Sequence, residues 1–507
     1  MEKAVAAALP LNPLSETKSY TYEKALKEAG FGRAQVILMF LCGFAMMSSI
    51  NESMGMGLIL PASQCDLELD LNRKGIIGGV VFVGVLISTH FWGYQTDLRG
   101  RRAVLRVSLL ATTVCSFATS FVNSFHLMVV LRFLVGLFVS ASGSAAIVYL
   151  GEFCPSNRRG QMILYACAIA GFGSAYVAVI DCWILSYEWS IVITESFTIR
   201  PWRLLFLLNG LPGLISGLAF WCYPESPRFL LAEGRHDEAL EVLCWIHQQN
   251  KQASFAVYSL TTELDQKASN KSDQGIGWFR RFCSQVSPLL ETRNSINLMV
   301  CCVQSVTLYV TYGGLGMWFP QIMNLVFSSS ESSTGDRICS ILQSNSTTVK
   351  AIESSTSNEC DDTFQPETFI YSFALGTMTA CNSLLNSCFL TLCSEKTLLY
   401  INMIVAGCAG IALQYITHSY SVAILFCVEI NVAAVCIVLV RSMQVSLFPT
   451  QLRATAVSLT SLVGRIGQII ANMVTGVLIV YHCTLTLYFV AGLLFVSAGL
   501  NALVRQQ

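Results

Sequence analysis

Among the ionisable residues inside the long apolar stretches of this sequence, where a charge is costly, five are candidates for chemistry. Three are acids, Glu52, Asp181 and Glu429, and two are bases, Arg132 and Arg465. An ionisable side chain at the centre of a membrane-spanning helix costs on the order of 2.5–3.5 kcal/mol on insertion scales, so each is a candidate for substrate binding or ion coupling. The acids suit proton exchange or recognition of a cation, and the bases suit recognition of an anion.

Residue type alone leaves structural alternatives open. Glu52 and Asp181 can lie close enough to a membrane surface to be hydrated, and an acid and a base can neutralise each other as a buried pair. Aromatic side chains are a second set of candidates for lining a solute cavity, although Trp and Tyr are also enriched at membrane boundaries. The aromatic candidates are Tyr149, Tyr165, Trp183 and Tyr312.

A charged loop separates two of the apolar stretches. Residues Gly93–Arg102, GYQTDLRGRR, have the form G-x-x-x-D-x-x-G-R-R. The two glycines permit a tight turn, and the acid and paired arginines suit a short link at a membrane surface, pinned by charge pairs. A simpler interpretation is a polar turn whose charges only fix the topology.

The elements that must carry these residues are membrane-spanning helices. The chain has 507 residues, 53% hydrophobic and 12% charged, whereas soluble domains carry about 25% charged residues. Twelve runs have about the twenty apolar residues that cross a bilayer core, so the sequence predicts an all-α polytopic membrane protein. The runs are 34–60, 75–95, 104–123, 126–150, 161–187 and 203–223, then 295–319, 368–393, 397–416, 420–440, 455–481 and 483–504.

The distribution of basic residues predicts the orientation. Of the 31 Lys and Arg, 23 fall on the side that holds both termini and five on the other side, so both termini are predicted to be cytoplasmic. No signal peptide is expected, because residues 1–32 are polar. The predicted parts are a cytoplasmic N-tail (1–33), a first six-helix half (34–223), a cytoplasmic linker (224–294) and a second half (295–504) that contains a luminal or extracellular loop (320–367).

Both polar segments carry local signals. In the linker, Ser226-Pro227 predicts a helix start and Gly234 a stop, and an apolar stripe predicts a second helix at 237–249. The opposite loop holds an N-glycosylation acceptor at Asn345. It also holds Cys339 and Cys360, which would face an oxidising compartment. A disulfide between these two cysteines is predicted, with two free thiols as the alternative.

Several function classes are excluded by composition. Lys plus Arg equals Asp plus Glu, so no nucleic-acid surface is expected. The twenty cysteines are scattered, with no metal-ligand spacing, so no metal site or cofactor is predicted. No nucleophile–base arrangement or phosphate loop stands out, so an enzyme is not predicted. The expected partners are a small-molecule solute, protons and membrane lipids.

The two groups of six spans are related by an internal repeat. A shift of 294 residues lays Glu152–Gly160 over Ser446–Ala454, matching Pro155 with Pro449 and Arg159 with Arg453. Both stretches link the fourth and fifth spans of their group. Parallel six-span halves are one architecture of secondary transporters, with the substrate site near the membrane midplane between the halves.

At this point the chain resembles the major facilitator superfamily across nearly its whole length. The resemblance is carried by GYQTDLRGRR, by Arg132–Gly136, by the EFCPSNRRG link and by Pro224–Leu231, which is similar to sugar porters and organic-ion transporters. Pro201-Trp-Arg203, Tyr312–Pro320 and the long loop after span seven are similar to the synaptic vesicle 2 branch.

The resemblance implies a cytoplasmic gate of charge pairs that hold the cytoplasmic side shut in the outward-open state. The sequence departs from the family pattern in three places: Leu98 replaces a basic residue, Ser446 replaces an acid, and 394–397 lacks the glycines and paired bases. The last two departures predict that the second-half gate is weaker than the first. Carried over by motif position, the gate residues are Gly93, Asp97, Gly100, Arg101, Arg102, Glu152, Arg159, Glu225, Arg228 and Arg453.

The function predicted is a transmembrane secondary transporter that moves a small polar or charged organic solute by alternating access, with proton coupling through a buried acid. The alternative is a protein of similar fold that no longer transports and acts as a vesicle-membrane receptor or trafficking component. The weakened second-half motifs favour the alternative, and the retained intramembrane charges favour transport. A vesicle membrane and the plasma membrane suit the sequence equally.

Overall fold

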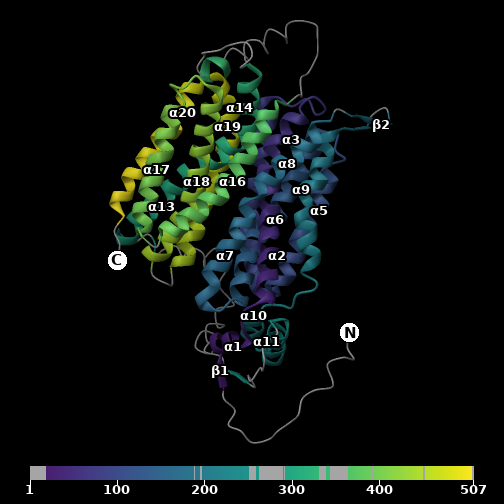
Figure 1. Ribbon diagram of the computed structural model, residues 1–507, viewed down its shortest axis with the longest axis vertical. Coiled ribbons are helices and arrows are strands. Elements are labelled where there is room, and N and C mark those ends of the chain that lie inside the picture. The colour runs from purple at the N-terminus through teal and green to yellow at the C-terminus, as the bar shows by residue number, and fades with distance from the viewer. Residues whose placement is uncertain are drawn as a thin grey trace, which may run out of the picture.

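The computed structural model describes residues 19–187, 189–194, 197–250, 259–261, 289, 292–329, 338–342, 364–390, 392–448 and 452–504. Its long helices form two groups that stand side by side in one bundle (Figure 1). The first group consists of α2 (Arg33–Met54) with α3 (Met56–Ala62), α4 (Leu71–Arg99), α5 (Arg101–Thr119), α6 (Phe125–Phe153), α7 (Ser156–Gly171) with α8 (Gly173–Leu185), and α9 (Pro201–Ala219).

The second group begins with a helix that changes its winding. Here α13 (Thr292–Tyr309) continues through a π-helical turn, η4 (Val310–Leu315), into α14 (Gly316–Ser329). The other members are α16 (Pro366–Phe389), α17 (Glu395–Ala412), α18 (Ser419–Leu447), α19 (Arg453–Tyr481) and α20 (Cys483–Leu500), which ends in the short η5 (Asn501–Leu503). The predicted all-α fold of twelve spans in two sets of six is confirmed.

Ten segments in the described part of the chain are long and apolar enough to cross a membrane. The two spans that are less apolar are α16 and α17. Helix α16 carries Thr379, Asn382 and Asn386, whose side chains hydrogen-bond within the second half. Their partners make these polar groups tolerable in a spanning helix, because little water is available there to satisfy them.

The internal repeat is visible in the helix boundaries. Adding 294 to the ends of α6, Phe125–Phe153, gives 419 and 447, which are the ends of α18, Ser419–Leu447. Both helices have 29 residues. The shift found in the linking motifs therefore holds for the helices that precede them.

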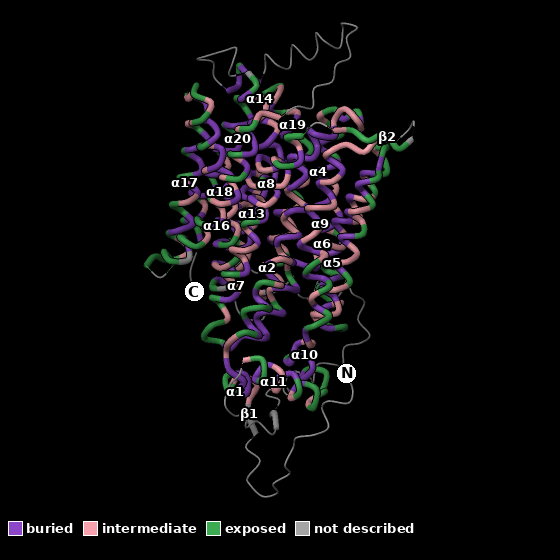
Figure 2. The backbone as a smooth tube through the Cα atoms, turned by 45° about the vertical axis from the view of Figure 1, so that its right-hand side comes forward, coloured by how far each residue is buried: buried purple, intermediate pink, exposed green. Residues whose placement is uncertain are grey.

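Two ends of the bundle can be distinguished. At the linker end lie α1 (Tyr22–Ala29), α10 (Pro227–Ala232) and α11 (His236–Asn250), together with strand β1 (Ser19–Thr21), which pairs in parallel with β4 (Ser259–Thr261). Near the opposite end, the hairpin end, β2 (Ile191–Thr194) pairs antiparallel with β3 (Phe197–Ile199) (Figures 1 and 2).

The helices of the linker end pack onto the first group. Ser226 Oγ accepts from Phe229 N at 3.3 Å and caps α10, and the predicted stripe of α11 is buried. Asn250, at the end of α11, accepts from Ala34 N at 3.1 Å. The N-tail was expected to be only a polar segment, whereas residues 22–29 form α1, which buries Ala25, Leu26 and Ala29 (Figure 2).

The two halves approach most closely between the hairpin end and the middle of the bundle. A Cβ on Gly57 would lie 2.6 Å from Met317 O, one on Gly75 would lie 3.0 Å from Met473 O, and one on Gly376 would lie 2.3 Å from Ala175 N. Each glycine permits backbone contact between an element of the first half and one of the second. These contacts close the hairpin end.

Candidate functional site

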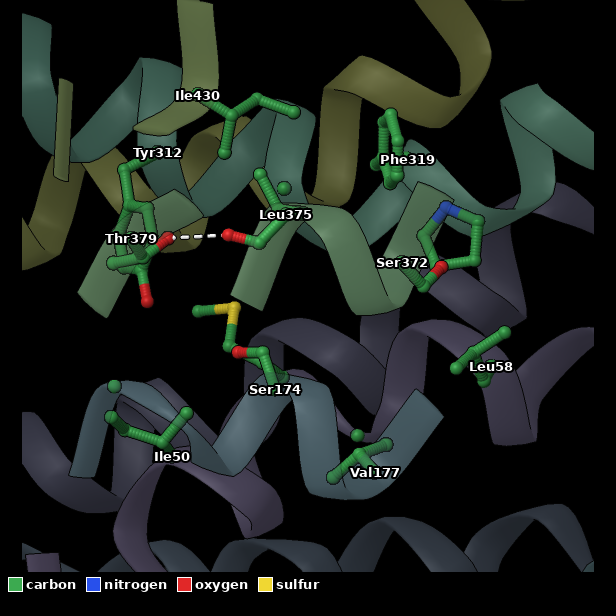
Figure 3. Close-up of a pocket in the computed structure, with 15 residues that line it drawn as sticks. Ile50, Leu58, Ser174, Val177, Tyr312, Phe319, Ser372, Leu375, Thr379 and Ile430 are labelled. Carbon is green, nitrogen blue, oxygen red and sulfur yellow. Dashed lines mark hydrogen bonds between the residues drawn. The ribbon is translucent and has the colours of Figure 1, made fainter. Parts of the chain in front are cut away.

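A cavity lies between the halves, bounded by α2, α3, α7 and α8 on one side and by η4, α14, α16 and α18 on the other (Figure 3). Its volume is about 60 Å³, whereas pockets that hold drug-sized ligands have roughly 300–1,000 Å³. The cavity is therefore too small for such a ligand in this conformation. Its polar lining residues are Ser174, Tyr312, Ser372 and Thr379, and its apolar walls include Leu58, Val177, Phe319 and Ile430.

Tyr312 is the one aromatic candidate from the sequence that lines this cavity. It belongs to the π-helical turn, a feature that often marks functional sites. Tyr149 lies at the linker end instead, where its hydroxyl donates to Pro224 O. Tyr165 and Trp183 are exposed, Trp183 to 61%. These three residues do not line the cavity.

Glu52 and Arg132 form a buried ion pair inside the first half. Glu52 Oε2 lies 3.0 Å from Arg132 Nη1, and their side chains are only 2% and 1% exposed. Arg132 Nη2 also donates to Ser116 and Thr119, and its guanidinium lies over the Phe206 ring at 4.7 Å. The pairing is the alternative that the sequence left open for these charges.

The position of Glu52 on α2 explains why it faces its own half. Ile50 and Met54 line the cavity, and a residue two positions from each lies about 200° around an α-helix. Glu52 therefore points away from the cavity. Its Oε1 has no hydrogen-bond partner among the described residues, so the carboxylate keeps one unsatisfied acceptor.

The other two acids are buried without an ion-pair partner in the described part of the chain. Asp181, on α8, lies beside Asn209 of α9, and both of its oxygens lack a hydrogen bond. Glu429, on α18, points toward α17 and α20, where its Oε1 would lie 2.8 Å from a Cβ on Gly410. Neither residue lines the cavity, although Ile430, next to Glu429, does.

Arg465 lies beside an aromatic ring instead of an acid. Its Cζ is 6.0 Å from the centroid of Tyr309, and Arg441 Nη2 donates to the Tyr309 hydroxyl at 2.6 Å. Sequence reasoning did not select Tyr309 or Arg441. The available signals were the spacing of Tyr309 and Tyr312, one turn apart, and the position of Arg441 inside the run VCIVLVRSM.

The first-half gate residues are assembled at the linker end. Arg101 contacts both Asp97 Oδ1, at 3.3 Å, and Glu152 Oε2, at 3.2 Å. Gly100 has a φ of +91°, and a Cβ there would lie 2.4 Å from Glu225 Oε2. The turn between α4 and α5 thus needs a glycine for its conformation and for its contact with Glu225.

Further contacts join this turn to neighbouring segments. Glu225 Oε1 accepts from the backbone N–H of Arg102, which also donates from its side chain to Phe220 O and Trp221 O. Arg228 acts electrostatically on Glu152. Gly93 has open space around its Cα. The structure therefore brings the first-half gate residues into one charged cluster around Gly100.

One partner of this cluster was missed by sequence reasoning. Arg159 Nη2 lies 2.7 Å from Glu23 Oε1, on α1, and Arg159 Nε donates to Gly151 O. Glu23 belongs to the segment treated as a tail. The signal was the apolar spacing of Ala25, Leu26 and Ala29, which fits one face of a helix.

The second half has a hydrogen bond where the first half has the ion pair between Arg101 and Glu152. The 294-residue shift carries Arg101 onto Glu395 and Glu152 onto Ser446. Where the first pair makes an ion pair at 3.2 Å, Ser446 Oγ donates to Glu395 Oε2 at 3.1 Å. Arg453, the remaining gate residue, donates to Phe448 O within its own half. The contact keeps its place in the repeat, but it joins an acid to a hydroxyl and contains no base.

The predicted disulfide has a different partner. Cys339 is bonded to Cys483, the first residue of α20, across a sequence separation of 144. Cys339 lies in the helical segment 338–342, buried near Gln414 and bonded to the start of α20. Cys483 lies between the last two predicted spans, on the same side of the membrane as the loop that holds Cys339. The sequence therefore contained a signal for this pairing. Cys360 and Asn345 lie outside the described residues.

The chain was compared with known proteins. Residues 18–326 match the family model "Sugar (and other) transporter". Synaptic vesicle glycoprotein 2A of Rattus norvegicus is 31% identical over 332 residues, which are 61% of this chain and 44% of that protein. Synaptic vesicle glycoprotein 2C of Mus musculus is 29% identical over 331 residues, which are 61% of this chain and 45% of that protein. The match thus spans less than half the length of these relatives.

Solved transporter structures share the fold. The partially occluded inward open conformation of the xylose transporter XylE from E. coli has a TM-score of 0.64 and 12% identity, and covers 96% of this chain and 100% of that chain. A D-xylose-proton symporter has a TM-score of 0.59 and 14% identity, and covers 92% and 95%. The predicted transporter class, as opposed to an enzyme, is confirmed by the family match. The chain is a multi-pass membrane protein of the sugar (and other) transporter family, within the major facilitator superfamily, and is similar to the synaptic vesicle 2 branch.

Proposed function

We propose that the chain moves a small polar or charged organic solute across a membrane by alternating access around the cavity of Figure 3. The observation that supports this most is the cavity's place between two halves that touch at the hairpin end. At the linker end, by contrast, no ion pair among the described residues includes a residue of the second half. Such an arrangement fits an inward-facing, occluded state.

The linker end is proposed to face the cytoplasm. The excess of Lys and Arg on that side favours this orientation, and it puts the charged cluster around Gly100 at the inner mouth of the pathway. In the outward-facing state, the second half would close against this cluster. The host would be a vesicle membrane, as the similarity to synaptic vesicle glycoproteins suggests, or the plasma membrane.

Proton coupling is proposed to run through Glu52. Its pairing with Arg132 in a site from which solvent is excluded gives the protonated and deprotonated states different contacts, because protonation of the carboxylate weakens its hold on the guanidinium. Phe206, Ser116 and Thr119 would then retain the arginine. Glu429 is a less favourable carrier, because it faces α17 and α20.

Uptake by proteoliposomes tests transport. Purified protein is reconstituted, and entry of radiolabelled glucose, phenylacetate and tetraethylammonium is measured with and without an imposed proton gradient. Saturable uptake above that of protein-free liposomes supports the proposal. Absence of uptake for neutral, anionic and cationic solutes alike, with protein that elutes as one folded species, counts against it.

A non-transporting receptor or trafficking role is the second candidate. The similarity to synaptic vesicle glycoproteins favours it, as does the hydrogen bond between Ser446 and Glu395, which stands where the first half has an ion pair. Glu52→Gln separates the two roles, because it removes a charge buried in the first half without changing the surface loops. Loss of uptake at normal abundance supports transport, whereas an unchanged cellular phenotype with this variant supports the receptor role.

A further inference from the structure

The second half holds two guanidinium groups that converge on one phenol. Arg441 of α18 donates to the Tyr309 hydroxyl at 2.6 Å, and Arg465 of α19 lies over the same ring, with its Cζ 6.0 Å from the centroid. Arg441 is exposed and Arg465 is half-buried. Three helices, α13, α18 and α19, therefore bring two positive charges to one place. We call these three residues the arginine–tyrosine cluster.

No carboxylate within the described residues forms an ion pair with either arginine. Glu395 accepts from Ser442 and Ser446. Glu429 faces Gly410 and Ala491, and Glu52 is engaged by Arg132. None of these acids pairs with the cluster, which therefore carries a net positive charge.

The depth of Arg465 makes this charge unusual. It stands twelve residues after Arg453, the first residue of α19, which is about 18 Å along the helix axis and about halfway through a bilayer core of roughly 30 Å. A guanidinium at this depth is costly unless it faces a pathway or a partner. A residue that only marks the cytoplasmic side would lie nearer the helix end.

The repeat places Arg465 at the level of the cavity. The 294-residue shift maps Arg465 onto Gly171, which lines the cavity from the first half. Tyr309 lies one turn before Tyr312, another lining residue, on the side toward the linker end. The cluster thus borders the cavity on the side from which the inward-facing state would be entered.

We propose that the arginine–tyrosine cluster is the anion-binding part of the substrate site, and that the transported solute is an organic anion. This inference rests on the proposed transport function. Two guanidinium groups recognise a carboxylate or sulfonate by charge-assisted hydrogen bonds, and the Tyr309 hydroxyl supplies a further donor. The uncharged body of the solute would lie in the cavity, against Leu58, Val177 and Phe319, with Ser174 and Thr379 as polar contacts.

The test measures binding before transport. The full chain is placed in lipid nanodiscs, and binding of phenylacetate, of the neutral phenylacetamide and of tetraethylammonium is measured by titration calorimetry at fixed salt. Phenylacetate should bind at least about tenfold more tightly than phenylacetamide, since hydrogen bonds to a charged group are worth about 1.5–3 kcal/mol. Equal affinity for the acid and its amide, or preference for the cation, overturns the proposal.

Variants assign the binding to the cluster. Arg465→Gln and Arg441→Gln should each weaken phenylacetate binding at least about tenfold, and Arg465→Lys should retain part of the affinity because the charge remains. The matched control is Arg106→Gln. Arg106 also lies over an aromatic ring, Trp221, at 5.2 Å, but on α5, in the first half. If Arg465→Gln elutes as a folded species and binds phenylacetate like the parent protein, the assignment fails.

Binding and uptake together distinguish this inference from the proposed function. If phenylacetate binding depends on Arg465 but the protein shows no uptake, the proposed anion site is supported and the proposed transport function is overturned. If glucose or tetraethylammonium is taken up equally by the parent and by Arg465→Gln, the proposed transport function is supported and the proposed anion site is overturned. Uptake of phenylacetate that is lost in Arg465→Gln but kept in Arg106→Gln supports both.

Discussion

At the scale of the residue, the ion pair between Glu52 and Arg132 shows how a membrane protein keeps a charge inside its fold. The two side chains meet at 3.0 Å with 2% and 1% exposure. Desolvation of each ion costs several kcal/mol, and the partner and its hydrogen bonds offset this cost. Removing either side chain alone should therefore destabilise the protein strongly, because the remaining side chain becomes a buried unpaired charge.

Removing one member should be worse than removing both. Glu52→Gln leaves the Arg132 guanidinium without its acid and should destabilise the protein by about 3–5 kcal/mol. Arg132→Gln in the same chain should restore part of that loss, because no charge is then left alone. Thermal unfolding in detergent measures the difference. A double variant that is less stable than both single variants would show that the pair does not act as a unit.

The Cys339–Cys483 bond predicts a redox-dependent stability. Cys339→Ser and Cys483→Ser, singly or together, should lower the unfolding free energy by about 2–4 kcal/mol, because the bond closes a long loop in the unfolded chain of 144 residues. Reducing agent should destabilise the parent by more than it destabilises the variants, which keep, among the described cysteines, only the disulfide of Cys65 to be reduced. Cys408→Ser, an exposed free thiol, is the control, and non-reducing peptide mapping identifies the bonded pair.

At the scale of the element, the π-helical turn η4 lets one span pack closely against α19. A Cβ on Gly313 would lie 2.4 Å from the Gln468 side chain, and one on Gly314 would lie 2.9 Å from the Ala471 Cβ. A Cβ on Gly464, in α19, would lie 2.5 Å from the ring of Tyr309. Because these glycines have no side chains, η4 and α19 can pack closely, and this packing positions Tyr309 and Tyr312.

A methyl group at this interface should disturb both stability and uptake. Gly314→Ala should cost about 1–3 kcal/mol, as overpacking does, and should lower the maximal uptake rate because η4 lines the cavity. The measurement pairs thermal unfolding with initial uptake rates. Gly492→Ala on α20, where a Cβ would meet nothing within 4 Å, is the matched control. If Gly314→Ala behaves like this control, the close packing of η4 is not important for either property.

At the scale of the whole molecule, contact at the hairpin end holds the two halves in the state observed. Gly57 approaches Met317 O, and Gly376 approaches Ala175 N, closely enough that a Cβ would collide with backbone. Backbone cannot yield as a flexible side chain can. The closed hairpin end therefore depends on these two positions having no side chain.

A larger residue at Gly57 should open the hairpin end. Gly57→Val should raise the labelling rate of Ser372→Cys, a cavity position, by a membrane-impermeant maleimide added on the hairpin side. The expected change is severalfold, because the variant removes contacts made only in the closed state. Gly143→Val, at a glycine with open space around it, is the control. Unchanged labelling in folded Gly57→Val protein would contradict this account of closure.

Much of this architecture was predictable because it depends on composition and periodicity. Most spans were placed within a few residues of their helices, since bilayer thickness fixes the length of an apolar run. The seventh span, predicted to end at 319, continues to Ser329 in α14. The 294-residue repeat predicted the correspondence of α6 and α18. The turn at Gly100 was predictable from two glycines and an acid, because these residues are close together in the sequence.

The contents of the site were less predictable, because they depend on the direction in which each side chain points. Glu52 and Ile50 lie two residues apart on α2, yet one faces Arg132 and the other the cavity. An intramembrane charge in the sequence does not show which of these it will face. The partner of Cys339 was mispredicted for a related reason, since the choice was restricted to one loop while α20 lay nearer in space.

The helices α1, α10 and α11 contact the first half through buried side chains and through Asn250. Their attachment supplies a fixed reference point for single-molecule measurements. A fluorophore at the exposed Gln248 of α11 would report the orientation of the first half, and one at the exposed Ser394, before α17, would report that of the second. Energy transfer between the two dyes would then record each conformational cycle in real time, without any label in the solute pathway.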